Sequence, residues 1–270
     1  MRLGIGTYTF AWAIGFPGHT PARPLSAWDL LERAMRLRVR VVQFCDNLPL
    51  VQLPKPDLES FARRVSELGL EIELGTRGLG SDNLRANLQL AQRFGCKFLR
   101  LVIDSSGDEP APEEAVARIK PVMGKFEAAG VCLAIENHDR FPSATLAWII
   151  QQLGPERAGV CLDTVNSFGA LEGPEIVVEN LAPFTLCLHV KDFTIRRPSH
   201  QMGFVVEGCA PGEGRLDVPW LLGALKVSPH PFNAILESWV TPGESLEETI
   251  ARESAWAEEG VRYLRRFISD

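Results

Sequence analysis

Several features that would assign a sequence to a common class are missing here. No apolar run approaches the roughly 20 residues of a membrane-spanning helix. The first residues, MRLGIGTYTFAW, lack the sustained apolar core and small-residue cleavage site of a secretory signal. The chain contains no C-x-x-C pair, which argues against a zinc–thiolate site or a disulfide framework. We therefore expect a cytoplasmic protein whose six cysteines are reduced and mostly buried.

Charge and glycine patterns argue against two further classes. Asp and Glu (34 residues) outnumber Lys and Arg (28), so no basic face for general nucleic-acid binding is expected. The first apolar stretch continues as GIGTYTFAW and not as a G-x-G-x-x-G turn leading into a helix, which disfavours a dinucleotide-binding fold. No low-complexity segment or flexible linker divides the chain, and we expect a single domain spanning residues 1–270.

Short apolar stretches alternate with longer amphipathic segments along the whole chain. Each apolar stretch is nearly continuous, as parallel strands covered on both faces are. The eight candidate strands begin at Leu3, Val39, Leu70, Lys97, Val131, Ala158, Thr185 and Asn233. Helical segments between them end at glycines such as Gly69 and Gly95, and Pro121 is expected to break the fourth helix. This rhythm predicts a (β/α)8 barrel, with a doubly wound open sheet as the main alternative.

Polar residues stand at the C-terminal ends of the last four predicted strands. Glu136 follows VCLAI, Asp163 lies in GVCLDTVN, His189 in LHVKD and Glu237 in AILESW. The first two steps, 27 and 26 residues, each match one strand–helix repeat. The third step, 48 residues, includes a long segment (193–215) that we expect to form an elaborated loop over the site. Because catalytic groups project from the C-terminal ends of barrel strands, these four side chains are expected to converge.

Three carboxylates and one imidazole at a common point make an oxygen-rich site with one nitrogen donor. Such a set suits Mn²⁺ or Mg²⁺, with Co²⁺ or Zn²⁺ as alternatives. Without a cation the carboxylates would repel one another, and at least one would take up a proton. The alternative is a purely structural polar layer in which some of them pair with Lys191, Arg100 or Arg215. The matched spacing of all four favours the metal site.

The motifs LAIENHD, GVCLDTVN, LHVKD, GEGRLD and ILESW, taken together, resemble the xylose isomerase-like TIM barrels. This superfamily includes sugar isomerases and epimerases related to tagatose and psicose 3-epimerases, hydroxypyruvate isomerase and inosose dehydratase. The resemblance extends over essentially the whole chain and is strongest between residues 131 and 239. The ordered set of five motifs is specific for the superfamily but not for a substrate.

The resemblance implies roles for particular residues. Glu136, Asp163, His189 and Glu237 would bind one divalent cation, and Glu136 and Glu237 would also be the catalytic acid/base pair that moves a proton through an enediolate. Lys191 would hydrogen-bond the substrate or stabilise its negative oxygen. Relatives often form dimers or tetramers, so a homodimer or homotetramer remains open.

One position departs from the family pattern. Many relatives carry a histidine three residues after the aspartate of the sixth strand, where this chain has Asn166. The change weakens the inference of ketose 3-epimerase activity. With only five histidines, the chain also lacks the additional ones with which the endonuclease IV branch of the superfamily holds three zinc ions.

Other residues are candidates for substrate contact. His138 follows Glu136 by two positions and could line the pocket, as could Asn166. Arg100 interrupts an apolar strand, so it is expected either to reach the substrate or to pair with a buried carboxylate. Glu213, in GEGRLD, is expected either to contact the substrate or simply to form a turn.

We expect an isomerase or epimerase acting on a small sugar or sugar acid. The absence of a glycine-rich phosphate loop favours an unphosphorylated substrate. The same metal and glutamates would also serve a lyase that removes water or an aglycone from a keto-sugar or keto-inositol. A third hypothesis, from another functional class, is a non-catalytic barrel that binds a sugar.

Overall fold

Eight parallel strands close into a barrel, as the sequence predicted. The structure is a computed structural model that describes residues 1–268. The strands follow one another around the barrel in chain order, and the circle closes where β10 pairs with both β1 and β7. Their bounds are β1 Leu3–Gly6, β2 Val41–Phe44, β3 Glu71–Arg77, β4 Phe98–Val102, β5 Cys132–Glu136, β6 Ala158–Asp163, β7 Thr185–Val190 and β10 Ala234–Leu236.

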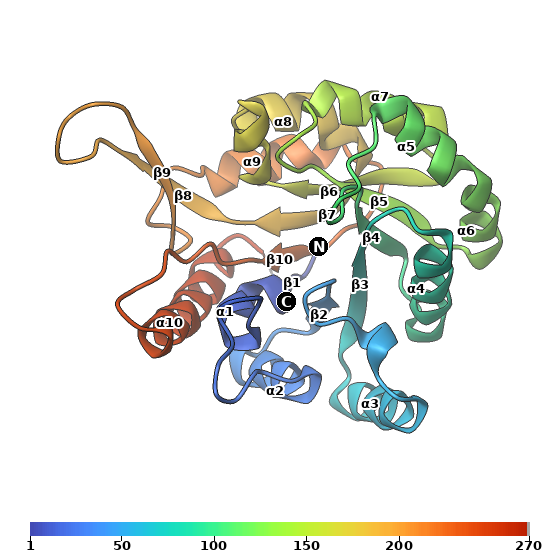
Figure 1. The fold of residues 1–270 in the computed structure, drawn as a ribbon, viewed down its shortest axis with the longest axis horizontal. Coiled ribbons are helices and arrows are strands. Elements are labelled where there is room, and N and C mark those ends of the chain that lie inside the picture. The colour runs from blue at the N-terminus through green and yellow to red at the C-terminus, as the bar shows by residue number, and fades with distance from the viewer. Residues whose placement is uncertain (269–270) are drawn as a thin grey trace.

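Helices surround the barrel and cover its outer face (Figure 1). Their bounds are α1 Ala11–Ile14, α2 Ala27–Leu37, α3 Lys55–Leu68, α4 Ser81–Phe94, α5 Pro112–Ile119, α6 Met123–Ala129, α7 Ser143–Leu153, α8 Pro174–Leu181, α9 Val218–Ala224 and α10 Leu246–Leu264. The predicted glycine stops are confirmed: Gly69 and Gly95 end α3 and α4 in the left-handed conformation. Pro121 lies in a 3-10 turn that separates α5 from α6, which confirms the expected break. None of the described helices is both long and apolar enough to cross a membrane.

The interior of the barrel explains how the polar residues reach one level. Side chains two positions apart on a strand point to the same face. A small buried apolar cluster lies inside the barrel, below the C-terminal ends of the strands. It includes Phe98, Ala134, Cys161, Cys187 and Ile235. Two residues further along each of these strands the inward position is polar. These polar residues are Arg100, Glu136, Asp163, His189 and Glu237, and all five are buried.

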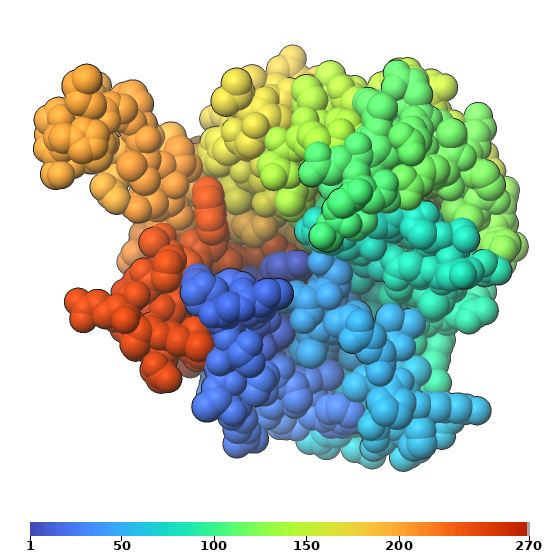
Figure 2. Space-filling view, viewed as in Figure 1, coloured from blue at the N-terminus to red at the C-terminus, as the bar shows by residue number. Residues whose placement is uncertain are grey.

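The segment predicted as an elaborated loop, residues 193–215, contains regular structure. Strands β8 (Asp192–Arg196) and β9 (Val205–Cys209) form an antiparallel hairpin. The sequence analysis predicted an elaborated loop here without its strands, which form because the residues of DFTIR and VVEGC pair with each other outside the barrel. The hairpin extends away from the barrel, and its tip forms a separate lobe in the space-filling view (Figures 1 and 2).

The cysteines are all free thiols, in agreement with the sequence prediction. Four of them are buried, and Cys161 and Cys187 lie opposite each other on β6 and β7.

Candidate active site

The four predicted ligands converge at the C-terminal end of the barrel. Nδ1 of His189 lies 3.1 Å from Oε1 of Glu237, 3.5 Å from Oε2 of Glu136 and 3.8 Å from Oδ2 of Asp163. Glu136, Asp163 and His189 each offer one donor atom within 4.8 Å of the others. Glu237 is not part of this three-residue group, but its Oε1 makes the shortest of the three contacts to Nδ1 of His189.

The inward-facing donor atoms of this cluster lack hydrogen-bond partners. Among the residues that the structure describes, Nδ1 of His189 and Oε1 of Glu237 are buried without a hydrogen bond and lie 3.1 Å apart, and the buried Oδ2 of Asp163 has only its ion pair with Lys191. Buried polar groups without hydrogen-bond partners are rare in native proteins, and a bound ion would supply such a partner. The other oxygen of Asp163 accepts from the backbone N–H groups of Val165 and Asn166, at 2.9 and 2.8 Å, which fixes the direction of its free oxygen. The donor set therefore fits a divalent cation.

Lys191 neutralises part of the carboxylate charge. Its Nζ lies 2.7 Å from Oδ2 of Asp163 and 2.8 Å from Oε2 of Glu237, and it donates to Oδ1 of Asn166 at 3.2 Å. Burial lowers the pKa of Lys191, but the carboxylates of Asp163, Glu237 and Glu136 outweigh it and raise this pKa. Lys191 is thus a fixed cation at the site, as its predicted role near a negative oxygen requires.

A buried arginine links the site to the second strand. Nε of Arg100 donates to Oε2 of Glu136, and one of its terminal nitrogens lies 2.7 Å from Oδ1 of Asp46. The space for Arg100 comes from Gly75 on the neighbouring strand, where a Cβ would lie 2.9 Å from the arginine Cδ. Arg100 was predicted either to reach the substrate or to pair with a buried carboxylate. The structure shows the ion pair, with Glu136.

Both oxygens of Glu136 are held by donors. Arg100 donates to Oε2, and Nδ2 of Asn166 donates to Oε1 at 2.8 Å. Burial raises the pKa of Glu136, but Arg100, followed by His189 and Lys191, lowers it to about 2. Burial lowers the pKa of His189, whereas Glu237 and Glu136 raise it to about 10 in the absence of a cation. Glu136 is therefore a carboxylate at any physiological pH.

Sequence reasoning missed several residues that act on the site. Asp46 follows β2 and accepts from Arg100, from Nε of Arg77 at 2.9 Å and from the hydroxyl of Tyr8 at 3.1 Å. Gln43 lies inside the barrel with its Oε1 2.7 Å from Nε2 of His189. The available signal was a lone glutamine in the apolar stretch VRVVQFC and an aspartate at its C-terminal end.

A cleft of about 540 Å³ adjoins the predicted ligands through Asn166 and Lys191, which contact Glu136, Asp163 and Glu237, but none of the four ligands lines it. Its lining includes His138, Asn166, Phe168, Lys191, Val206 and Trp239. His138, Asn166 and Lys191 thus line a cleft, and their contact with a substrate stays a prediction. Glu213 does not line this cleft: its side chain is exposed, and its backbone N–H closes a turn onto the carbonyl of Ala210 at 3.0 Å.

Comparison with known proteins identifies the family. The model of the xylose isomerase-like TIM barrel family matches residues 31–267. The chain belongs to this family. It is also 32% identical over 264 residues to the 3-oxo-isoapionate decarboxylase of Pectobacterium atrosepticum, covering 98% of this chain and 95% of that protein.

Solved structures of this family share the fold. D-psicose 3-epimerase, crystallised in the presence of D-fructose, superposes with a TM-score of 0.71 over 100% of both chains at 14% identity. A xylose isomerase-like barrel protein from Mycobacterium smegmatis in complex with magnesium gives a TM-score of 0.70 over 97% of both chains at 15% identity. At such identities the likeness concerns the fold alone.

Proposed function

We propose that this protein is a divalent-metal-dependent enzyme that decarboxylates a 3-oxo sugar acid through an enediolate. The full-length relative at 32% identity bears the name of such a decarboxylase. The sequence-based prediction of an isomerase or epimerase working through an enediolate did not include loss of CO₂. The two reactions differ in how the enediolate is formed, and the arrangement around Glu136 favours decarboxylation.

The cation would be held by Glu136, Asp163, His189 and Glu237. Their convergence and their mixed oxygen and nitrogen donors support Mn²⁺ or Mg²⁺, with Co²⁺ or Zn²⁺ as alternatives. When bound, the cation would polarise the substrate carbonyl and offset the charge of the carboxylates.

The carboxylate of Glu136 is the observation that carries the proposal. An epimerase with two catalytic glutamates needs each of them to accept or return a proton at carbon. Both oxygens of Glu136 are already engaged by Arg100 and Asn166. Among the described residues, Glu237 meets no arginine: its Oε2 pairs with Lys191, and its Oε1 makes no hydrogen bond and lies 3.1 Å from Nδ1 of His189. This asymmetry supports a reaction that needs a single proton-transfer group.

Decarboxylation of a 3-oxo acid has that requirement. The C–C bond to the carboxylate breaks, CO₂ leaves, and the electron pair is delocalised onto the 3-oxo oxygen. One proton must then be added to the carbon, and Glu237, after taking that proton from water, would deliver it. Lys191, next to Glu237, stabilises the negative oxygen.

The charge of the site also supports an acidic substrate. The carboxylates of Asp46, Glu136, Asp163 and Glu237 face three cations, Arg77, Arg100 and Lys191. A divalent cation beside a neutral His189 would leave one net positive charge. Such a site attracts a singly charged anion more strongly than a neutral sugar.

The test measures CO₂ release from 3-oxo sugar acids by the Mn²⁺-loaded protein. The same reaction is run in D₂O to measure how much deuterium the product takes up at carbon. We expect CO₂ release with one deuteron incorporated per turnover. Glu237→Gln should lower kcat at least 100-fold, on the scale of losing a general acid. Glu244→Gln, which changes an exposed glutamate in the loop after the same strand, should leave kcat unchanged. Carbon-bound proton exchange in ketoses without any CO₂ release would instead establish the isomerase or epimerase activity.

A further inference from the structure

Gln43, inside the barrel, contacts the side of His189 that faces away from the carboxylates. Its Oε1 lies 2.7 Å from Nε2 of His189, the shortest contact that this nitrogen makes among the described residues. Both side chains are completely buried. Gln43 takes no part in the reaction proposed above, and solvent does not account for its orientation.

The amide of Gln43 is held with its oxygen toward the histidine. Its Nε2 donates to Oε2 of Glu73 at 3.1 Å and to Sγ of Cys187 at 3.3 Å. Glu73 in turn accepts from Nδ2 of Asn233 at 2.9 Å through its other oxygen. Because the amide nitrogen of Gln43 donates to Glu73 and Cys187, its carbonyl oxygen faces His189.

This orientation selects one tautomer of His189. A carbonyl oxygen only accepts hydrogen bonds, so in the neutral ring, the form that binds a cation, Nε2 of His189 carries the hydrogen and Nδ1 keeps its lone pair. Nδ1 is the atom that faces Glu136, Asp163 and Glu237, and it has no hydrogen-bond partner in the described part of the chain.

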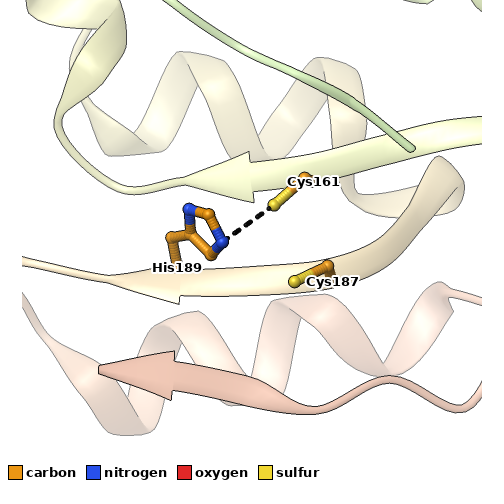
Figure 3. A group of neighbouring side chains, drawn as sticks. All are labelled: Cys161, Cys187 and His189. Carbon is orange, nitrogen blue, oxygen red and sulfur yellow. Dashed lines mark hydrogen bonds between the residues drawn. The ribbon is translucent and has the colours of Figure 1, made fainter. Parts of the chain in front are cut away.

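A competing contact shows why the selection matters. Sγ of Cys161 lies 3.2 Å from Nε2 of His189 (Figure 3). A thiol that donated its hydrogen to Nε2 would leave the ring hydrogen on Nδ1, where it would block a cation. Gln43 and Cys161 therefore favour opposite tautomers, and the shorter contact belongs to Gln43.

We propose that Gln43, oriented by Glu73, is a positioning residue that keeps Nδ1 of His189 available to the divalent cation. The inference rests on the metal site of the proposed function, but it concerns only how the ring is held. Partners of this kind on metal-binding histidines change metal affinity by about 10- to 100-fold.

The test is the affinity for Mn²⁺, measured by isothermal titration calorimetry at constant pH. Gln43→Leu keeps the volume of the side chain and removes the acceptor, and we expect 10- to 100-fold weaker binding. Cys45→Ala changes another buried neighbour of Gln43 and leaves the amide in place, so its affinity should match that of the wild type. Gln43→Leu/Cys161→Ala removes the competing thiol as well and should recover part of the loss.

A second measurement separates positioning from general damage. In the Zn²⁺-loaded wild type, ¹⁵N NMR of the histidine rings should show a hydrogen on Nε2 of His189. If Gln43→Leu does not fold, Glu73→Gln, whose side-chain amide no longer fixes the orientation of Gln43, should weaken Mn²⁺ binding by a smaller factor. The inference would be overturned if Gln43→Leu bound Mn²⁺ with the affinity of the wild type. The same holds for a folded Glu73→Gln, if that variant has to replace Gln43→Leu. A hydrogen on Nδ1 of His189 in the Zn²⁺-loaded wild type would also overturn it. Absence of Mn²⁺ binding by the wild type would instead remove the metal site of the proposed function.

Discussion

At the scale of single residues, Arg100 determines much of the character of the site. Its side chain is 2% exposed and lies between two carboxylates, those of Glu136 and Asp46. A charged group at such depth is tolerated only when it is paired. Arg100 fixes Glu136 as a permanent anion, and so gives the two glutamates of the site different chemical abilities.

Removing Arg100 should destabilise the protein strongly. Arg100→Met leaves Glu136 and Asp46 without their buried counter-charge, and breaking such a pair from one side costs about 3–5 kcal/mol. The free energy of unfolding from urea titration measures the loss. Arg77→Met removes a more exposed partner of the same Asp46 and should cost about 1 kcal/mol or less. Equal losses in the two variants would contradict the assignment of Arg100 as the central buried ion.

At the scale of secondary-structure elements, the β8–β9 hairpin forms one wall of the cleft. Gly208 on β9 allows the hairpin to approach the chain after β10, since a Cβ there would lie 1.9 Å from the carbonyl oxygen of Trp239. Val206 and Trp239 both line the cleft. The base of the hairpin is fixed by Asp192, which accepts the backbone N–H groups of Gly212, Gly214 and Leu216. The insertion therefore shapes the substrate side of the site, while the barrel strands supply the predicted metal ligands.

A second element-level contact makes stability depend on pH. Glu253 on α10 is buried and accepts the backbone N–H groups of Trp12 and Ala13, at 2.8 and 3.1 Å, which joins α10 to α1. Burial raises the pKa of Glu253 to about 7, against an ordinary value of 4.5, although the two N–H groups lower it. The folded state thus binds this proton more tightly than the unfolded state.

The sign of the effect follows from that difference. The contribution of Glu253 to stability is complete below about pH 4.5 and is lost as the pH rises to about 7, a change on the order of 3 kcal/mol. Glu253→Gln does not titrate, so the free energy of unfolding should vary less between pH 5 and 7 than in the wild type. Glu259→Gln, at an exposed position of the same helix, should keep the wild-type slope. An unchanged slope in Glu253→Gln would show that Glu253 titrates normally.

At the scale of the whole molecule, the barrel and the convergence of Glu136, Asp163, His189 and Glu237 could be predicted from the sequence. The reason is local, because each residue lies two positions beyond an inward-facing apolar or thiol side chain on its strand. Side chains two positions apart point to the same face, so all four residues point into the barrel near the C-terminal ends of their strands. The partners of these residues could not be predicted. Whether Arg100 would meet Glu136 or the substrate depends on the space left by Gly75, a contact between neighbouring strands that no single stretch of sequence records.

The hairpin in the inserted segment (residues 193–215) was also not predicted from the sequence. Its two strands pair only with each other, so the repeat of strand and helix that organises the rest of the chain does not extend to them. The predicted substrate contact of Glu213 remains a prediction, and the exposed side chain in the turn after β9 does not add support to it.

A cation at the proposed site should stabilise the entire barrel, because its ligands come from β5, β6 and β7 and from the end of β10. Binding that is confined to the folded state adds RT ln(1 + [L]/Kd), about 2.7 kcal/mol at a Mn²⁺ concentration of 100 Kd. For a chain of this size that corresponds to a rise in Tm of roughly 5–10 °C, and EDTA should reverse it. Asp163→Asn keeps the oxygen that accepts from Val165 and Asn166 but weakens the inward ligand, so the rise should disappear. Asp139→Asn, an exposed change at the same mouth of the barrel, should retain it. A rise that persists in Asp163→Asn would place the cation elsewhere in the molecule.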